Sequence, residues 1–111
     1  MAKVYGIFTI ELKEGIEPRQ FIDFINQKFA PMASRIGWRG FPAISDRGER
    51  KGKLALIWDF DSIEQRDLRV PVEDQITDEA LRLMGPDWEA NGKIWDSLVA
   101  SSTVTDYVVQ E

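Results

Sequence analysis

The sequence contains neither cysteine nor histidine in its 111 residues. Without cysteine it can form no disulfide bond, offer no thiolate nucleophile and supply no sulfur ligand to zinc. Without histidine it lacks the usual base near neutral pH and the usual ligand of haem or zinc. Serine–histidine catalysis and haem degradation with a proximal histidine are therefore excluded. We expect neither a metal nor a cofactor, and acid–base chemistry would need a carboxylate, tyrosine or lysine with a shifted pKa.

Long apolar runs are absent as well. No stretch approaches the ~20 consecutive apolar residues that span a bilayer. Charged residues follow the first methionine at once, beginning with Lys3, which is unlike a signal peptide. The apolar fraction of 43% is enough for one hydrophobic core, and the length suits a single domain over residues 1–111. We expect no membrane partner and, with no cysteine to oxidise, a cytoplasmic location.

Positive charge is scarce and unevenly placed. The net charge is −5; residues 1–53 carry ten basic and six acidic residues, whereas residues 54–111 carry four and thirteen. An acidic total argues against a nucleic-acid partner, whose phosphates require clustered cations. One basic cluster exists, in a glycine-flanked segment that also contains Glu49, and we interpret it as a solvated hairpin tip. Its members are Arg47, Arg50, Lys51 and Lys53.

The first half of the chain shows both secondary-structure periods. Apolar residues alternate over residues 3–12, which predicts a strand. A helix is expected from Pro18, since proline suits the first turn. Pro31 lies inside its apolar stripe and predicts a kink or an early end, and Gly37 marks the stop. The stripe consists of Phe21, Ile22, Ile25, Phe29, Met32 and Ile36.

The second half predicts two strands, short helices and a last strand. Residues 38–45 and 53–60 are expected to pair as strands across the hairpin turn 46–52. Ser62, followed by Gln65, predicts a helix start by the capping-box pattern, and Pro71 ends that helix. Further helices are expected from Thr77 to Gly85 and from Pro86 onward, the last with Trp88, Trp95, Leu98 and Val99 on one side. A last strand over about 103–109 completes the chain.

The resulting order is β-α-β-β-α-β, with extra helix before the last strand. It predicts an α+β, ferredoxin-like antiparallel sheet with helices on one face only. The other face is too apolar for open water, so we expect a second copy of the sheet to cover it, giving a homodimer. The residues expected there are Tyr5, Ile7, Thr9, Ala55, Ile57 and Tyr107.

Two segments carry a family resemblance. Strand 53–60 runs through Trp58-Asp59-Phe60-Asp61-Ser62 into a helix with Arg66 and Arg69, and Gly85-Pro86-Asp87-Trp88 follows. These segments resemble the NIPSNAP-like branch of the dimeric α/β-barrel superfamily, which itself has no agreed reaction. The resemblance implies a dimer whose facing sheets enclose a cavity, and in some branches a cofactor-independent monooxygenase. The histidine common just before the tryptophan is missing here, where Leu56-Ile57-Trp58 stands.

Six residues are candidates for contacting a ligand between the sheets. Asp59 could act as a base at the cavity mouth, or could be a rim carboxylate paired with a nearby arginine. Tyr5 and Thr9 could offer hydroxyls, or simply pack at the dimer seam. The six ligand candidates are Tyr5, Thr9, Arg39, Ile57, Asp59 and Tyr107. No catalytic residue is assigned.

Other conspicuous residues have structural interpretations. Trp58 shares a face with Leu54, Leu56 and Phe60, which predicts a core position. Arg66 and Arg69 could clamp an anion, but such a pair more often holds a helix to acidic neighbours. Trp88 and Trp95, seven residues apart, predict a core or interface stripe, or else a wall on which a ligand stacks.

Two functions stay open. The chain could be a dimer that binds a small apolar or aromatic ligand, and it could act as a cofactor-independent enzyme of monooxygenase type. It could instead be a structural or protein-interaction module whose sheets pack together and leave no useful cavity.

Overall fold

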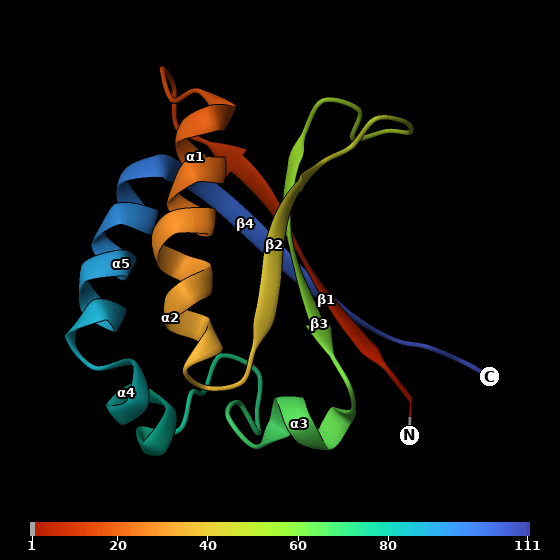
Figure 1. Ribbon diagram of the computed structural model, residues 1–111. Helices are drawn as coiled ribbons and strands as arrows, with labels where there is room; N and C mark the ends of the chain where they lie inside the picture. Colours follow the sequence, from red (N-terminus) through yellow and green to blue (C-terminus); the bar gives the residue numbers. More distant parts are fainter. Residues whose placement is uncertain (1) are drawn as a thin grey trace.

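The computed structural model describes residues 2–111 as one antiparallel sheet with helices on a single face (Figure 1). The strands stand in the order β2-β3-β1-β4, which is the ferredoxin-like order that the sequence predicts. Of the helices described, none has the length and apolar character needed to cross a bilayer. The strands are β1 (Val4–Leu12), β2 (Arg39–Ile44), β3 (Leu54–Phe60) and β4 (Val99–Val108).

The alternation of each strand sends every second side chain into the core beneath the helices. In β3 the buried and half-buried residues alternate without exception, because neighbouring side chains point to opposite faces. Trp58, as predicted, is a core residue and is only 4% exposed. The buried hydrophobic strand residues are Val4, Ile10, Leu54, Leu56, Trp58, Phe60 and Val99.

The first helix continues through Pro31. It comprises α1 (Pro18–Phe24), the π-helical turn η1 (Ile25–Phe29) and α2 (Ala30–Ser34), drawn as one continuous helix in Figure 1. The expectation that Pro31 ends the helix is wrong, because α2 continues to Ser34 and a π turn just before the proline accommodates its ring. There the Ala30 N–H donates to the Ile25 carbonyl, five residues back. A wider turn relieves the clash between a proline ring and the carbonyl four residues earlier. The expected kink stays a prediction.

The shorter helices start at the predicted caps. In α3 (Ile63–Asp67) the Ser62 hydroxyl accepts a hydrogen bond from the Gln65 N–H at 3.1 Å. The Gln65 side chain in turn accepts from the Asp61 N–H at 2.5 Å. Thr77 caps α4 (Asp78–Met84) in the same way, by accepting from the Ala80 N–H at 3.2 Å.

The last strand begins earlier than predicted. Helix α5 (Pro86–Leu98) leads directly into β4 at Val99, four residues before the expected start at 103. Val99 continues the apolar stripe of α5, so the helical period assigned it to the helix. It pairs instead with Leu12 of β1, next to an irregularity in the register between Glu11 and Leu12. Pairing with a distant strand decided this boundary.

Trp58 lies in a cluster of aromatic rings on the helical side of the sheet. The ring centroid lies 5.5 Å from that of Trp38 and 6.1 Å from that of Phe29. Its antiparallel neighbour on β2 is Gly40. A methyl group added at Gly40 would overlap the Trp58 ring, so only glycine lets β2 pass at this distance.

We predict that Gly40→Ala lowers the free energy of unfolding by about 1–3 kcal/mol, because the confined Trp58 ring must move. Urea denaturation followed by circular dichroism measures this change. Gly92→Ala in α5 is the control: nothing lies within 4 Å of the added carbon, and alanine favours a helix by about 1 kcal/mol over glycine. Equal stability of Gly40→Ala and the unmodified chain would contradict the packing described here.

Candidate functional site

The sheet surface away from the helices, called here the open face, collects all six ligand candidates. The antiparallel register arranges this face in three rows across the four strands. Phe41 and Tyr107 are exposed by 41% and 60%, and Ile7 and Ile57 are half-buried. The rows are Arg39–Asp59–Tyr5–Tyr107, Phe41–Ile57–Ile7–Thr105 and Ala43–Ala55–Thr9–Thr103. Their role in binding a ligand stays a prediction.

Asp59 is a paired carboxylate. Its side chain is only 8% exposed, and the Lys3 ammonium lies 2.7 Å from one of its oxygens. Arg39 donates a hydrogen bond to the other oxygen. The hydrogen bond from Lys3, with a further one from Arg39, holds the pKa of Asp59 below its ordinary value despite its burial. A carboxylate held ionised in this way is a weak base, so the geometry favours the rim-carboxylate interpretation.

The hydroxyl candidates on the open face are engaged or packed. Thr9 and Thr103 share a hydrogen bond between their hydroxyls across β1 and β4. The Lys3 ammonium lies 5.7 Å from the centre of the Tyr5 ring, within range of a cation–π contact. The Thr9–Thr103 bond joins β1 to β4, whereas Lys3 and Tyr5 are only two residues apart in the chain. The packing of Tyr5 and Thr9 at a dimer seam stays a prediction.

A cavity of about 780 Å³ lies on the opposite side of the sheet, between the strands and the helices. We call it the helix-side cavity. Its walls come from the sheet, from α2 and α5, and from the segment between α3 and α4. None of the six ligand candidates is among its described lining residues. The aromatic residues that line it are Phe8, Phe29, Trp38, Trp58, Phe60, Trp88 and Trp95, so all four tryptophans of the chain take part.

The cavity exists because the helices cover β4 incompletely. Alternation turns Ser102, Val104 and Asp106 of β4 toward the helical side, yet all three are exposed and line the cavity. Val104 is 37% exposed although its neighbour Phe8 in β1 packs against the core. The aromatic walls thus continue into an opening beside β4.

One basic side chain, Arg66, stands at the wall of the helix-side cavity. Its Nε donates to Asp67 at 3.1 Å and its Nη1 donates to Asp106 at 2.8 Å. Burial lowers the pKa of Arg66, but the hydrogen bonds to these two carboxylates outweigh it and raise the pKa overall. Arg69 instead donates from its Nε to the Ile36 carbonyl at 3.2 Å. Arg66 therefore has acidic partners, as the structural interpretation expects, whereas Arg69 binds a backbone carbonyl of the segment after α2.

The sequence contained a partial signal for this cavity. Trp88 and Trp95 were predicted as core, interface or ligand wall, and both line the cavity; Trp88 is 40% exposed. Trp38 was not singled out, although its indole N–H is buried with no hydrogen-bond acceptor among the described residues. Only the packing of α5 against the sheet brings these tryptophans together.

Comparisons with known proteins support the fold. Neither the protein-family models nor the functionally curated proteins gave a match to this chain. Among solved structures, an uncharacterised NIPSNAP-like domain protein from Burkholderia xenovorans is 14% identical, with a TM-score of 0.67, covering 97% of this chain and 85% of that one. A NIPSNAP family protein of unknown function from Agrobacterium tumefaciens is 20% identical, with a TM-score of 0.65, covering 96% and 87%.

A third structure comes from Bacteroides fragilis and is described as a dimeric protein of unknown function with a ferredoxin-like fold. It is 17% identical to this chain, with a TM-score of 0.54, and the match covers 96% of each. These likenesses confirm the NIPSNAP-like, ferredoxin-like fold inferred from the sequence. They assign no reaction or ligand.

We predict that Asp59→Asn lowers the free energy of unfolding by about 1 kcal/mol at pH 7, a value limited by the solvent exposure of Lys3 and Arg39. Because folding lowers the pKa of Asp59, its contribution is complete above the unfolded pKa and disappears as pH falls through the folded one. Urea denaturation at pH 7 and at pH 2–3 should show the two proteins converging in acid. A difference that persists unchanged in acid would contradict this assignment. Asp61→Asn, at an exposed carboxylate 3.8 Å from Lys3, is the control.

Proposed function

We propose that the chain forms a homodimer through the open face and that each subunit binds a small apolar or aromatic molecule in its helix-side cavity. The space between two facing sheets, where the sequence analysis expected a ligand, requires a second subunit to exist. The helix-side cavity is present within one chain. The open-face candidates, including Tyr5, Thr9 and Ile57, then serve chiefly as dimer contacts.

The volume and lining of the helix-side cavity carry the binding proposal. A volume of about 780 Å³ falls in the range of small-molecule sites, which are apolar with a few polar groups. Aromatic rings and apolar residues such as Met32 and Met84 line most of it, and its few polar groups include Arg66 and Asp106. An apolar molecule would gain by leaving water for these walls.

The layout of the open face supports the dimer proposal. Its central row is apolar at Phe41, Ile57 and Ile7 and ends at Thr105 on β4. At one end lies the cluster around Asp59, and at the other Glu11 accepts hydrogen bonds from Arg50 at 3.1 Å and Lys53 at 3.3 Å. An apolar centre with a polar rim is the usual anatomy of a protein interface. The similar protein from Bacteroides fragilis is described as dimeric.

The second candidate function is a structural or interaction module, which would keep the dimer and bind no ligand. This function is supported by the same open face, which can form a dimer contact whether or not a cavity binds a ligand. The cofactor-independent monooxygenase activity implied by the resemblance, and a cytoplasmic location, stay predictions.

Light scattering at micromolar concentration should give twice the 12.7 kDa mass of one chain. We predict that Ile57→Lys gives a folded monomer, because a lysine at the centre of an interface loses its water without gaining a partner. Leu68→Lys is the control, since Leu68 is 65% exposed and lies outside the open face. A monomeric wild-type chain, or an Ile57→Lys chain that stays dimeric, would exclude this interface.

The binding proposal is tested with N-phenyl-1-naphthylamine, a neutral probe whose fluorescence rises in apolar surroundings. We predict saturable binding to the wild-type chain and at least ~10-fold weaker binding to Gly92→Leu, whose side chain would enter the cavity from α5. Lys93→Leu, one residue further along α5 and facing solvent, should bind like wild type. No response in wild type, together with an intact dimer, would favour the structural module.

A further inference from the structure

The charges around the helix-side cavity are strongly unbalanced. Its described lining contains a single basic residue, Arg66, whose guanidinium already donates to two of the carboxylates. The other acidic residues of the lining have no ion-pair partner within 4 Å among residues 2–111. The five acidic lining residues are Asp67, Glu73, Asp74, Asp96 and Asp106.

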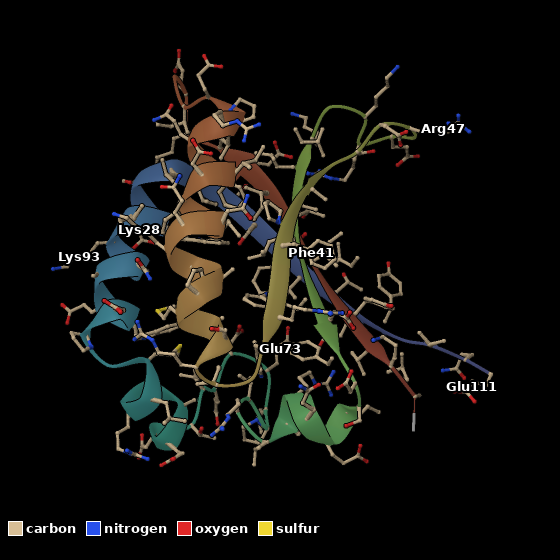
Figure 2. All side chains as sticks on the ribbon, viewed as in Figure 1. Lys28, Phe41, Arg47, Glu73, Lys93 and Glu111 are labelled. Atoms are coloured by element: carbon tan, nitrogen blue, oxygen red, sulfur yellow. The ribbon has the colours of Figure 1, made fainter. Side chains whose placement is uncertain are left out.

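The three unpaired carboxylates line the cavity from two parts of the chain, and all three residues are exposed. Asp96 belongs to α5, and Glu73 and Asp74 belong to the segment between α3 and α4. Figure 2 shows Glu73 in this segment, near the lower end of α2 and of the sheet. Carboxylates placed around low-dielectric walls add up to a negative potential inside, because such walls focus the field lines.

The aromatic walls prefer the same sign of ligand charge. The face of an aromatic ring carries negative potential and attracts a cation, most strongly with tryptophan. Trp38, Trp58, Trp88 and Trp95 all line the cavity. Aromatic walls surrounded by carboxylates are how proteins recognise ammonium groups that carry an apolar body.

An anionic ligand has no comparable partner here. Arg66 has N–H donors to spare, but Asp67 and Asp106 already offset its positive charge, and the unpaired carboxylates would repel an anion. A metal ion does not fit either, because no three acidic side chains among the described residues are grouped closely enough to hold one. The lining carboxylates are separated from one another, so they can attract a bulky organic cation without coordinating it closely.

We propose that the helix-side cavity selects a hydrophobic organic cation, a protonated amine or a quaternary ammonium compound with an aromatic or alkyl body. This inference rests on the proposed binding function and adds to it the charge and chemical class of the ligand. The apolar body occupies the aromatic walls, and the ammonium group lies toward the opening near Asp96, Glu73 and Asp74.

Three probes that share a naphthalene ring test the charge preference by isothermal titration calorimetry. They are (2-naphthylmethyl)trimethylammonium, neutral 2-naphthylmethanol and anionic 2-naphthoate. We expect the cation to bind at least ~10-fold more tightly than the neutral probe and the anion to bind most weakly. The advantage of the cation should shrink between 20 and 300 mM salt, because salt screens the exposed carboxylates.

Matched variants locate the preference. Glu73→Gln combined with Asp96→Asn should bring the affinity for the cation to within ~3-fold of that for the neutral probe, leaving the latter unchanged. Glu64→Gln combined with Glu89→Gln removes the same charge from exposed positions outside the cavity lining and should leave the cation affinity within ~2-fold of wild type. Both double variants replace exposed residues, so the fold should tolerate them.

The outcomes separate this inference from the binding function. If N-phenyl-1-naphthylamine and all three naphthalene probes fail to bind, the proposed binding function itself fails. If the neutral probes bind while the cation shows no advantage, or the anion binds most tightly, only the selection of a cation is overturned. Equal losses of cation affinity in the two double variants would also overturn it, since the effect would then come from net charge alone.

Discussion

The strict alternation of β3 is the constraint on which both surfaces of this molecule depend. A strand can turn each side chain to only one face of its sheet, so neighbours on β3 belong to different environments. The Trp58 side chain faces the helices, where it forms part of the core and part of the cavity wall. Ile57 and Asp59 go to the open face. One seven-residue strand thus contributes to a proposed dimer contact and to a proposed ligand site.

The two faces differ in how their charges are used. On the open face, Asp59 and Glu11 each have two basic partners, so the charges at the rim are largely balanced within the chain. Around the helix-side cavity the only described cation is shared by two carboxylates, and three more stay unpaired. Balanced charge suits a surface that meets its own copy, whereas unbalanced charge around aromatic walls suits a ligand of opposite sign.

Local patterns predicted most of the fold. They failed where a distant contact or a rarer helical geometry set the end of an element. The strands β1, β2 and β3, the Ser62 and Thr77 helix starts and the core position of Trp58 follow from period, cap and alternation. The predicted end of the helix at Pro31 is wrong because a π turn accommodates a proline ring that would clash in a regular α-helical turn. The assignment of Val99 to the helix is wrong because Val99 pairs with Leu12, which is too far away in the sequence for a local pattern to detect.

The sequence by itself determined the ferredoxin-like order of elements and the apolar open face. It also excluded the chemistry that histidine or cysteine side chains would supply. Those conclusions depend only on residue types and short spacings. The tertiary structure decided where a ligand can enter a single chain. Residues from β1, β3, β4, α5 and the segment after α3 meet at the helix-side cavity because α5 leaves β4 partly uncovered. The packing of the helices determines how much of β4 stays uncovered, and no periodic pattern in the sequence predicts that packing.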